Sequence, residues 1–224
     1  MNNSNPPKMT KTQKYVKLSM QIMLAVGLIS SIIVANWLNT VFIIFIIIFS
    51  ALPTIFAKHY NFILPTEFEL AAILFIFASL FLGSAYDFYY RFWWWDILLH
   101  GISAILLGIV GLLLVWVLNH NEKIELSLNP LFICIFSFSF VISIGALWEI
   151  YEFATDYFFD ANMQKSGLVD TMWDLIIDTV GALFVSGAAY VYYKTGHKSR
   201  IINEVQEFLS LNKAFFHKNK NTLK

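Results

Sequence analysis

Residues 94–118 read WWDILLHGISAILLGIVGLLLVWVL, where only Asp96, His100 and Ser103 interrupt the apolar side chains and glycines. A helix needs about 20 mostly apolar residues, each rising about 1.5 Å, to cross the hydrocarbon core of a bilayer. This stretch is long enough, and it begins with two ionisable residues one helical turn apart. It therefore predicts a membrane span with polar chemistry at one end.

The composition of the whole chain agrees with a membrane protein. Of its 224 residues, 58% are hydrophobic and 13% are charged, whereas about a quarter of the residues in soluble domains are charged. Five further stretches are long and apolar enough to span a bilayer, at residues 18–37, 40–57, 68–86, 131–153 and 171–193. We predict an all-α polytopic membrane protein with six spans and the lipid bilayer as its partner. The net charge of zero gives no sign of a nucleic-acid partner.

The basic residues predict how the chain is oriented. With six spans, all of the 15 Lys and Arg residues except Arg91 and Lys165 fall on the side of the N-terminus. Because basic loops favour the cytoplasmic side, we predict that both termini lie inside. The predicted parts are a basic cytoplasmic tail (1–17), a transmembrane domain (18–195) and an amphipathic, basic cytoplasmic tail (196–224).

Ionisable residues are concentrated toward the predicted outer face. An ionisable group at membrane depth is costly unless it is paired, bound or solvated, so it marks a candidate functional site. Nine of the 15 acidic residues and one of the five histidines lie in or beside the predicted spans: Asp87, Asp96, His100, Glu149, Glu152, Asp156, Asp160, Asp170, Asp174 and Asp178.

Helical spacing arranges most of these residues in three stripes, one on each of the last three spans. At about 100° per residue, the members of each stripe lie on one face of their helix. The stripes are Asp96 and His100; Glu149, Glu152 and Asp156; and Asp170, Asp174 and Asp178. Their deepest members reach a similar depth. We therefore expect the last three spans to form one outward-facing polar cavity.

So many carboxylates in an apolar site must be partly protonated or compensated by a cation. A histidine with several carboxylates suits zinc, manganese or iron, whereas carboxylates alone suit magnesium or calcium. The predicted ligands are Asp96, His100, Glu149, Glu152, Asp174 and Asp178. Their spacing matches no known metal motif. The alternative is a structural hydrogen-bonded network that joins the three helices with help from Arg91 and Lys165.

Local signals predict how the spans begin and pack. Asn129 and Pro130 form a helix cap and first-turn proline ahead of the fifth span. Small residues allow helices to approach closely in a membrane. Such residues occur in the fourth and sixth spans, at Ala104, Gly108, Gly111, Ala182 and Ser186.

Three motifs resemble those of the YjdF-like family of uncharacterised bacterial membrane proteins. They are WDILLHGIS at 95–103, GALWEIYEF at 145–153 and DTMWDLIIDTVGA at 170–182. The resemblance covers roughly residues 20–195 and implies a multi-pass protein of the bacterial cytoplasmic (inner) membrane. It brings no established activity.

A more distant resemblance is to VanZ-like proteins, which are linked to glycopeptide-antibiotic tolerance. The matching residues are Asp96, His100, Glu149, Asp170, Asp174 and Gly181. Asp178 stands where that family has Asn, which adds a titratable group at the deepest point of the stripe.

Three functions are consistent with this pattern. The first is an enzyme that uses a divalent cation or a carboxylate–histidine pair on an envelope or lipid-linked substrate, with His100, Glu149 and Asp178 as catalytic residues. The second is a proton- or cation-coupled carrier in which the same acids titrate. The third is a non-catalytic component of a membrane assembly. The apolar residues below Glu149 and Asp178 favour a site that opens to one side only.

Overall fold

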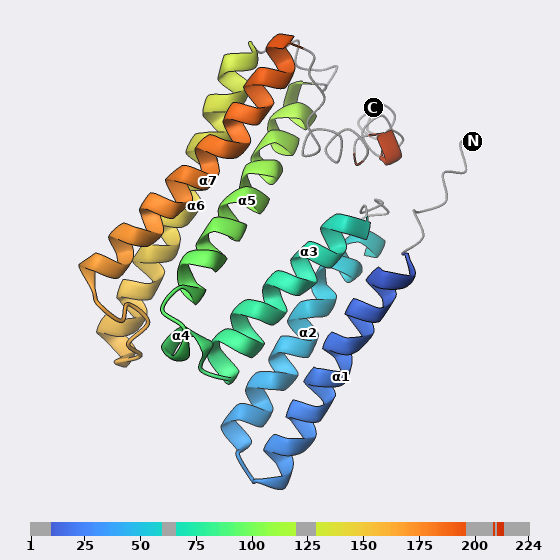
Figure 1. Ribbon diagram of the computed structural model, residues 1–224, viewed down its shortest axis with the longest axis vertical. Coiled ribbons are helices and arrows are strands. Elements are labelled where there is room, and N and C mark those ends of the chain that lie inside the picture. Colours follow the sequence, from blue (N-terminus) through green and yellow to red (C-terminus); the bar gives the residue numbers. More distant parts are fainter. Residues whose placement is uncertain (1–9, 60–65, 120–128, 196–207, 209, 213–224) are drawn as a thin grey trace, which may run out of the picture. The chain divides into compact units, whose positions relative to one another are not determined.

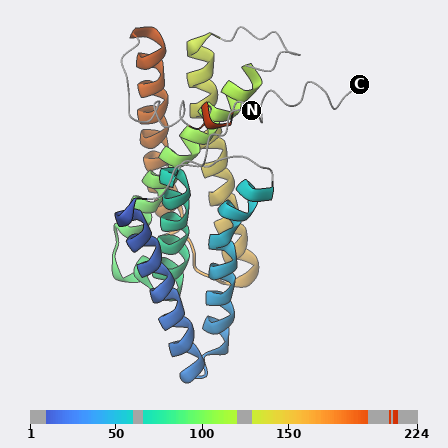
Figure 2. The same ribbon diagram turned by 90° about the vertical axis from the view of Figure 1, so that its right-hand side faces the viewer.

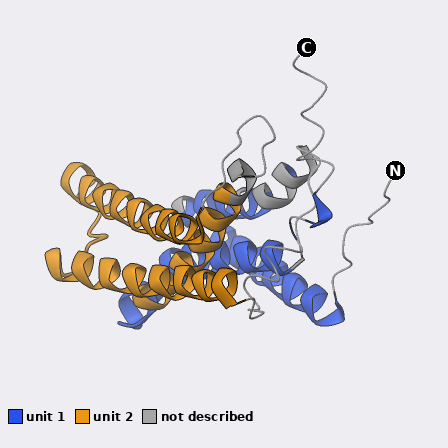
Figure 3. Cartoon of the chain, turned by 90° about the horizontal axis from the view of Figure 1, so that it is seen from above, with its two compact units in different colours: residues 1–95, 207–224 blue, residues 96–206 orange. Residues whose placement is uncertain are grey.

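A computed structural model describes residues 10–59, 66–119, 129–195, 208 and 210–212. All regular structure in these residues is helical, which confirms the predicted all-α class. The chain forms two compact units, unit 1 (Met1–Trp95 and Glu207–Lys224) and unit 2 (Asp96–Gln206), which Figure 3 shows in different colours.

Unit 1 is a bundle of helices that run alongside one another in both Figure 1 and Figure 2. Its core is made of apolar side chains from α1, α2, α3 and η1, including Met20, Ile43 and Phe77. Lys17 on α1 forms an ion pair with Glu69 on α3, at 2.8 Å between Nζ and Oε1. The elements are α1 (Lys11–Ile33), α2 (Trp37–His59), α3 (Thr66–Ile76), η1 (Phe77–Ala85) and α4 (Phe88–Arg91).

The third predicted span differs from a regular α-helix. Its second half, η1, is a π-helix of nine residues, a wider helix that usually occurs only as a single turn. At Gly83, a side chain would collide with the Tyr89 ring. Helical spacing predicted a span here but could not distinguish the π-helical turns from α-helical ones.

Unit 2 contains the three helices that carry the predicted polar stripes. They are α5 (Trp95–Asn119), α6 (Pro130–Phe159) and α7 (Leu168–Thr195). The predicted cap of α6 is confirmed, because the Asn129 side chain accepts a hydrogen bond from the backbone N–H of Leu131, at 2.9 Å. An eight-residue connection, residues 160–167, joins α6 to α7, and these two helices pack against each other along much of their length.

Small residues bring these three helices together, as predicted. Ala104, Val141 and Ala182, one from each helix, form a fully buried core. A Cβ atom added at Gly108 would lie 3.0 Å from the Val185 side chain. Ser137 on α6 donates a hydrogen bond to the backbone oxygen of Gly108, at 2.8 Å. The hydroxyl is thus satisfied without a second polar side chain.

Among the described residues, five helical segments are long and apolar enough to cross a membrane, by length and composition: Lys11–Ile33, Glu67–Ala85, Trp95–Val115, Pro130–Phe159 and Leu168–Thr195. The second predicted span, residues 40–57, falls in α2, whose described apolar run, Asn39–Ile48, is shorter. The predicted basic tails fall mostly outside the described residues, although α1 already begins at Lys11.

Candidate metal centre

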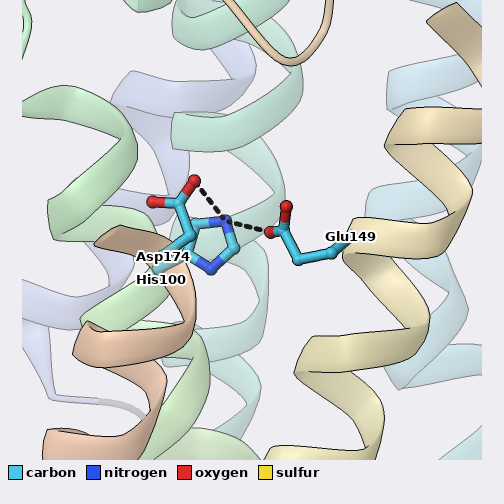
Figure 4. Close-up of side chains that lie close together, drawn as sticks. All are labelled: His100, Glu149 and Asp174. Atoms are coloured by element: carbon cyan, nitrogen blue, oxygen red, sulfur yellow. Dashed lines mark ion pairs between the residues drawn. The ribbon is translucent and has the colours of Figure 1, made fainter. Parts of the chain in front are cut away.

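The predicted polar cluster lies within unit 2, where the first turns of α5 and α7 meet the last turns of α6. Five of its members are almost completely buried, with exposed fractions of 7% for His100 and Glu152, 4% for Glu149 and 2% for both Asp174 and Asp178. Figure 4 shows the carboxylates of Glu149 and Asp174 approaching the same nitrogen of the His100 ring. The structure thus brings together residues from three stripes that are far apart in the sequence.

His100 Nε2 faces three carboxylate oxygens at equal distances. It lies 4.0 Å from Asp96 Oδ1, from Glu149 Oε1 and from Asp174 Oδ2. These separations are too long for hydrogen bonds. Two donors on a tetrahedral ion, each about 2.0–2.2 Å from it, lie about 3.3–3.6 Å apart. Nε2 and the oxygens would therefore have to approach one another by about 0.5 Å to bind a single ion.

His100, Glu149 and Asp174 form one of two groups among the described residues that have the spacing of metal ligands. One donor atom from each lies within 4.8 Å of the donor atoms of the other two. A small contraction would bring all three onto one ion. The chemistry of this set, one imidazole and two carboxylates, fits zinc, manganese or iron.

Asp178 contacts the opposite nitrogen of the same ring. Both of its carboxylate oxygens lie 3.4 Å from His100 Nδ1. A carboxylate on the second nitrogen is the usual partner of a metal-binding histidine, because it fixes the tautomer and the orientation of the ring. The position depends on Gly145 of α6, since a Cβ atom there would collide with Asp178 Oδ2.

Several buried oxygens of the cluster lack a hydrogen-bond partner among the described residues. They are both carboxylate oxygens of Glu149, Oδ2 of Asp174 and Oδ2 of Asp170. A buried polar atom without a partner is costly, and an unpaired charge is more so. Protonation or a bound cation would remove this cost.

A second group lies beside the first and shares one residue with it. Its members are Asp96, Asp170 and Asp174, whose donor oxygens also lie within 4.8 Å of one another. Lys165 supplies a positive charge here, with Nζ 2.7 Å from Asp96 Oδ2. The sequence indicated Lys165 only as a partner in a structural network.

The connection between α6 and α7 holds Lys165 in place. The Asp156 carboxylate accepts hydrogen bonds from the backbone N–H groups of Met163 and Gln164. The Gln164 side chain then donates to Thr171 Oγ1, at 2.7 Å, on the first turn of α7. Asp156 therefore holds the connection between α6 and α7, residues 160–167, in a fixed conformation beside the cluster.

The remaining predicted residues lie outside both groups. Glu152 is buried on α6 and accepts a hydrogen bond from Trp148 Nε1, at 3.0 Å. Asp160 ends α6 in a left-handed conformation, and Asp87 precedes α4 in unit 1. Asp170 was in the predicted stripe but not in the predicted ligand set. Gly145 was not singled out, although a glycine one turn before Glu149 is a signal that could have indicated a close contact.

Comparison with known proteins gives a family without an assigned activity. An uncharacterised protein of Thermotoga maritima is 28% identical over 171 residues, which cover 75% of this chain and 85% of that protein. No solved structure matches the chain. The more distant resemblance to VanZ-like proteins stays a prediction. The model of the family described as "Predicted membrane protein (DUF2238)" matches residues 16–195. This match confirms the predicted membership of an uncharacterised membrane-protein family, and the chain belongs to DUF2238.

Proposed function

We propose that the protein is a metal-dependent enzyme of the bacterial cytoplasmic membrane that acts on an envelope or lipid-linked substrate. A divalent cation would be held by His100, Glu149 and Asp174. One observation carries the proposal: His100 Nε2 lies 4.0 Å from Glu149 Oε1 and from Asp174 Oδ2. Neither of these two oxygens has a hydrogen-bond partner among the described residues.

The surrounding residues have separate tasks in this proposal. Asp178 is a positioning residue, which holds the His100 ring through Nδ1 so that Nε2 keeps its lone pair for the cation. Glu149 and Asp174 supply the negative charge. A divalent cation bound there would polarise a carbonyl or phosphoryl oxygen and make a bound water nucleophilic at neutral pH. Because the site lies at the end of three membrane helices, a substrate in or near the bilayer is the one it suits.

The core next to the cluster favours an enzyme over a carrier. One turn deeper than His100 and Asp178 lie Ala104 and Ala182, which pack on Val141 of α6 with at most 1% exposure. A carrier needs a polar path through to the other side, whereas an enzyme site can open to one side. In the described residues, Ala104, Val141 and Ala182 form an apolar layer at this depth, which favours a site that opens to one side.

The test is the metal content of the purified full-length protein in detergent. We expect about one transition-metal ion per chain in the wild type and none in His100→Asn or Glu149→Gln. The matched control is Glu152→Gln. Glu152 is buried on α6, as Glu149 is, and the amide oxygen of a glutamine at this position can still accept the hydrogen bond from Trp148 Nε1. This variant should keep its ion.

Thermal unfolding gives a second reading of the same centre. A ligand that binds only the folded state stabilises it by about 2.7 kcal/mol at 100 times its Kd. A chelator should therefore lower the melting temperature of the wild type and leave Glu149→Gln unaffected. Metal-free wild-type protein with no response to chelator would contradict the proposal.

A proton-coupled carrier is the second candidate, because protonation would also satisfy the lone oxygens of Glu149 and Asp174. Glu149→Gln mimics the protonated form. In a metal-free carrier this variant should be as stable as the wild type or more stable. In the metalloenzyme it should be less stable than the metal-loaded wild type.

A further inference from the structure

We infer that the cluster has a second cation position, formed by Asp96, Asp170 and Asp174, at which the Lys165 ammonium competes with a metal ion. The inference rests on the proposed function, because Asp174 would be shared with the ion that His100 and Glu149 hold. It goes further than the proposed function because it assigns two cation positions to the centre and identifies Lys165 as the side chain that competes with the second ion.

The acidic side chains are arranged for a second ion. Asp174 is 2% exposed, and its Oδ2, which faces His100 Nε2 at 4.0 Å, has no hydrogen-bond partner in the described part of the chain. Asp170 Oδ2, one helical turn away, is likewise buried without a partner. Asp174 belongs to both groups, and a carboxylate has two oxygens that can bind different ions. Two-cation enzyme sites place their ions about 3.5–4 Å apart, a distance that one shared carboxylate can span.

Lys165 shows that a positive charge is favourable at this position. Its Nζ lies 2.7 Å from Asp96 Oδ2, the same carboxylate that would bind the second ion. The Lys165 side chain is 25% exposed and that of Asp96 is 15% exposed, so the ammonium can leave toward the surface while the loop stays attached through Asp156 and Gln164. The ammonium and a metal ion cannot both occupy this position.

The ligands also indicate which ion the second position takes. All three are carboxylates, which favour hard cations such as magnesium, calcium or manganese. The first position includes an imidazole and suits zinc, manganese or iron. Manganese is the ion that suits both sets, so MnCl2 alone is the probe.

The experiment titrates the full-length protein in detergent with MnCl2 after all metal has been removed. The stoichiometry comes from elemental analysis, and electron paramagnetic resonance at low temperature detects whether two manganese ions are magnetically coupled. The variants are Lys165→Met, which removes the competing charge, Asp170→Asn, which removes a ligand of the second position alone, and Glu149→Gln, which removes a ligand of the first. Glu152→Gln is the matched control.

We expect Lys165→Met to bind two coupled ions, the second up to about fivefold more tightly than in the wild type, since an ion pair near the surface contributes up to about 1 kcal/mol. Asp170→Asn should bind one ion and give no coupled signal. One retained ion also shows that this variant is folded. Glu152→Gln should behave like the wild type.

Two failures can be told apart. If the wild type and Lys165→Met each bind one ion, with equal affinity and no coupling, the second position does not exist and the first stands. If the wild type and Lys165→Met bind none, the proposed function fails and the second position fails with it. Should Asp170→Asn not fold, the comparison of Lys165→Met with the wild type alone decides.

Discussion

At the scale of single residues, His100 has a different partner at each ring nitrogen. Nδ1 has both oxygens of Asp178 at 3.4 Å, and Nε2 has three carboxylates at 4.0 Å. This division assigns an orienting role to one acid and ligand roles to the others. It depends on Gly145, the residue that leaves room for the Asp178 carboxylate.

Gly145→Ala should therefore disturb the site without touching any charged group. The new methyl group must displace the Asp178 carboxylate, and overpacking of this kind costs about 1–3 kcal/mol. We expect a lower melting temperature together with weaker metal binding, measured by thermal unfolding and metal titration in detergent. Gly187→Ala is the control, because nothing lies within 4 Å of the new Cβ. It should be neutral or stabilising by up to about 1 kcal/mol. Equal effects of the two changes would contradict the role of Gly145.

At the scale of the helices, much of unit 2 could be predicted from the sequence, and the division of tasks within the cluster could not. Helical spacing places Asp174 and Asp178 on one face of a helix, and both indeed reach His100. Spacing does not say which ring nitrogen each acid meets, because that depends on how α5 rotates against α7. Glu152 shares the face of Glu149, yet the indole of Trp148, four residues earlier, binds it instead.

The contact that sets this rotation is itself open to test. A Cβ atom at Gly181 on α7 would lie 2.6 Å from the Cβ of Ala104 on α5. Gly181→Ala should thus destabilise the protein. Ala104→Gly should cost up to about 1 kcal/mol, the intrinsic cost of glycine in a helix. In the double variant Gly181→Ala/Ala104→Gly, the methyl group is moved from α5 to α7 and the contact still holds one methyl group. The midpoint of thermal unfolding should therefore be close to that of the wild type. Strictly additive losses would show that the two residues do not meet.

At the scale of the whole molecule, α2 decides the topology. In the part of the chain that the structure describes, five helical segments qualify as spans by length and composition. However, a turn of only three residues joins α1 to α2, and Ala35 in this turn is left-handed. After the turn, α2 packs against α1. If α1 crosses the bilayer, α2 has to return across it. The antiparallel pair supports six crossings, which would place both termini on the same side. The distribution of basic residues predicts that this side is the cytoplasm.

Cysteine labelling can test this topology. In a Cys134→Ser background, single cysteines at Tyr90 and Met163 should react with a membrane-impermeant thiol reagent added to intact cells. Cysteines at Phe62, Lys123 and Val205 should react only after the cells are opened. If α2 does not cross, every position after it changes sides. Labelling of position 123 from outside would then place the cluster at the cytoplasmic face.

The ion pair between Lys165 and Asp96 also has a consequence for biosynthesis. A newly made chain enters the bilayer before any metal has reached it, and an isolated carboxylate at that depth is costly. Lys165 travels in the same chain and can offset one of these charges from the moment α7 follows α6 into the membrane. Lys165 can thus act as the counter-ion of Asp96 until a metal ion binds. We therefore expect unit 2 to insert and assemble in metal-starved cells.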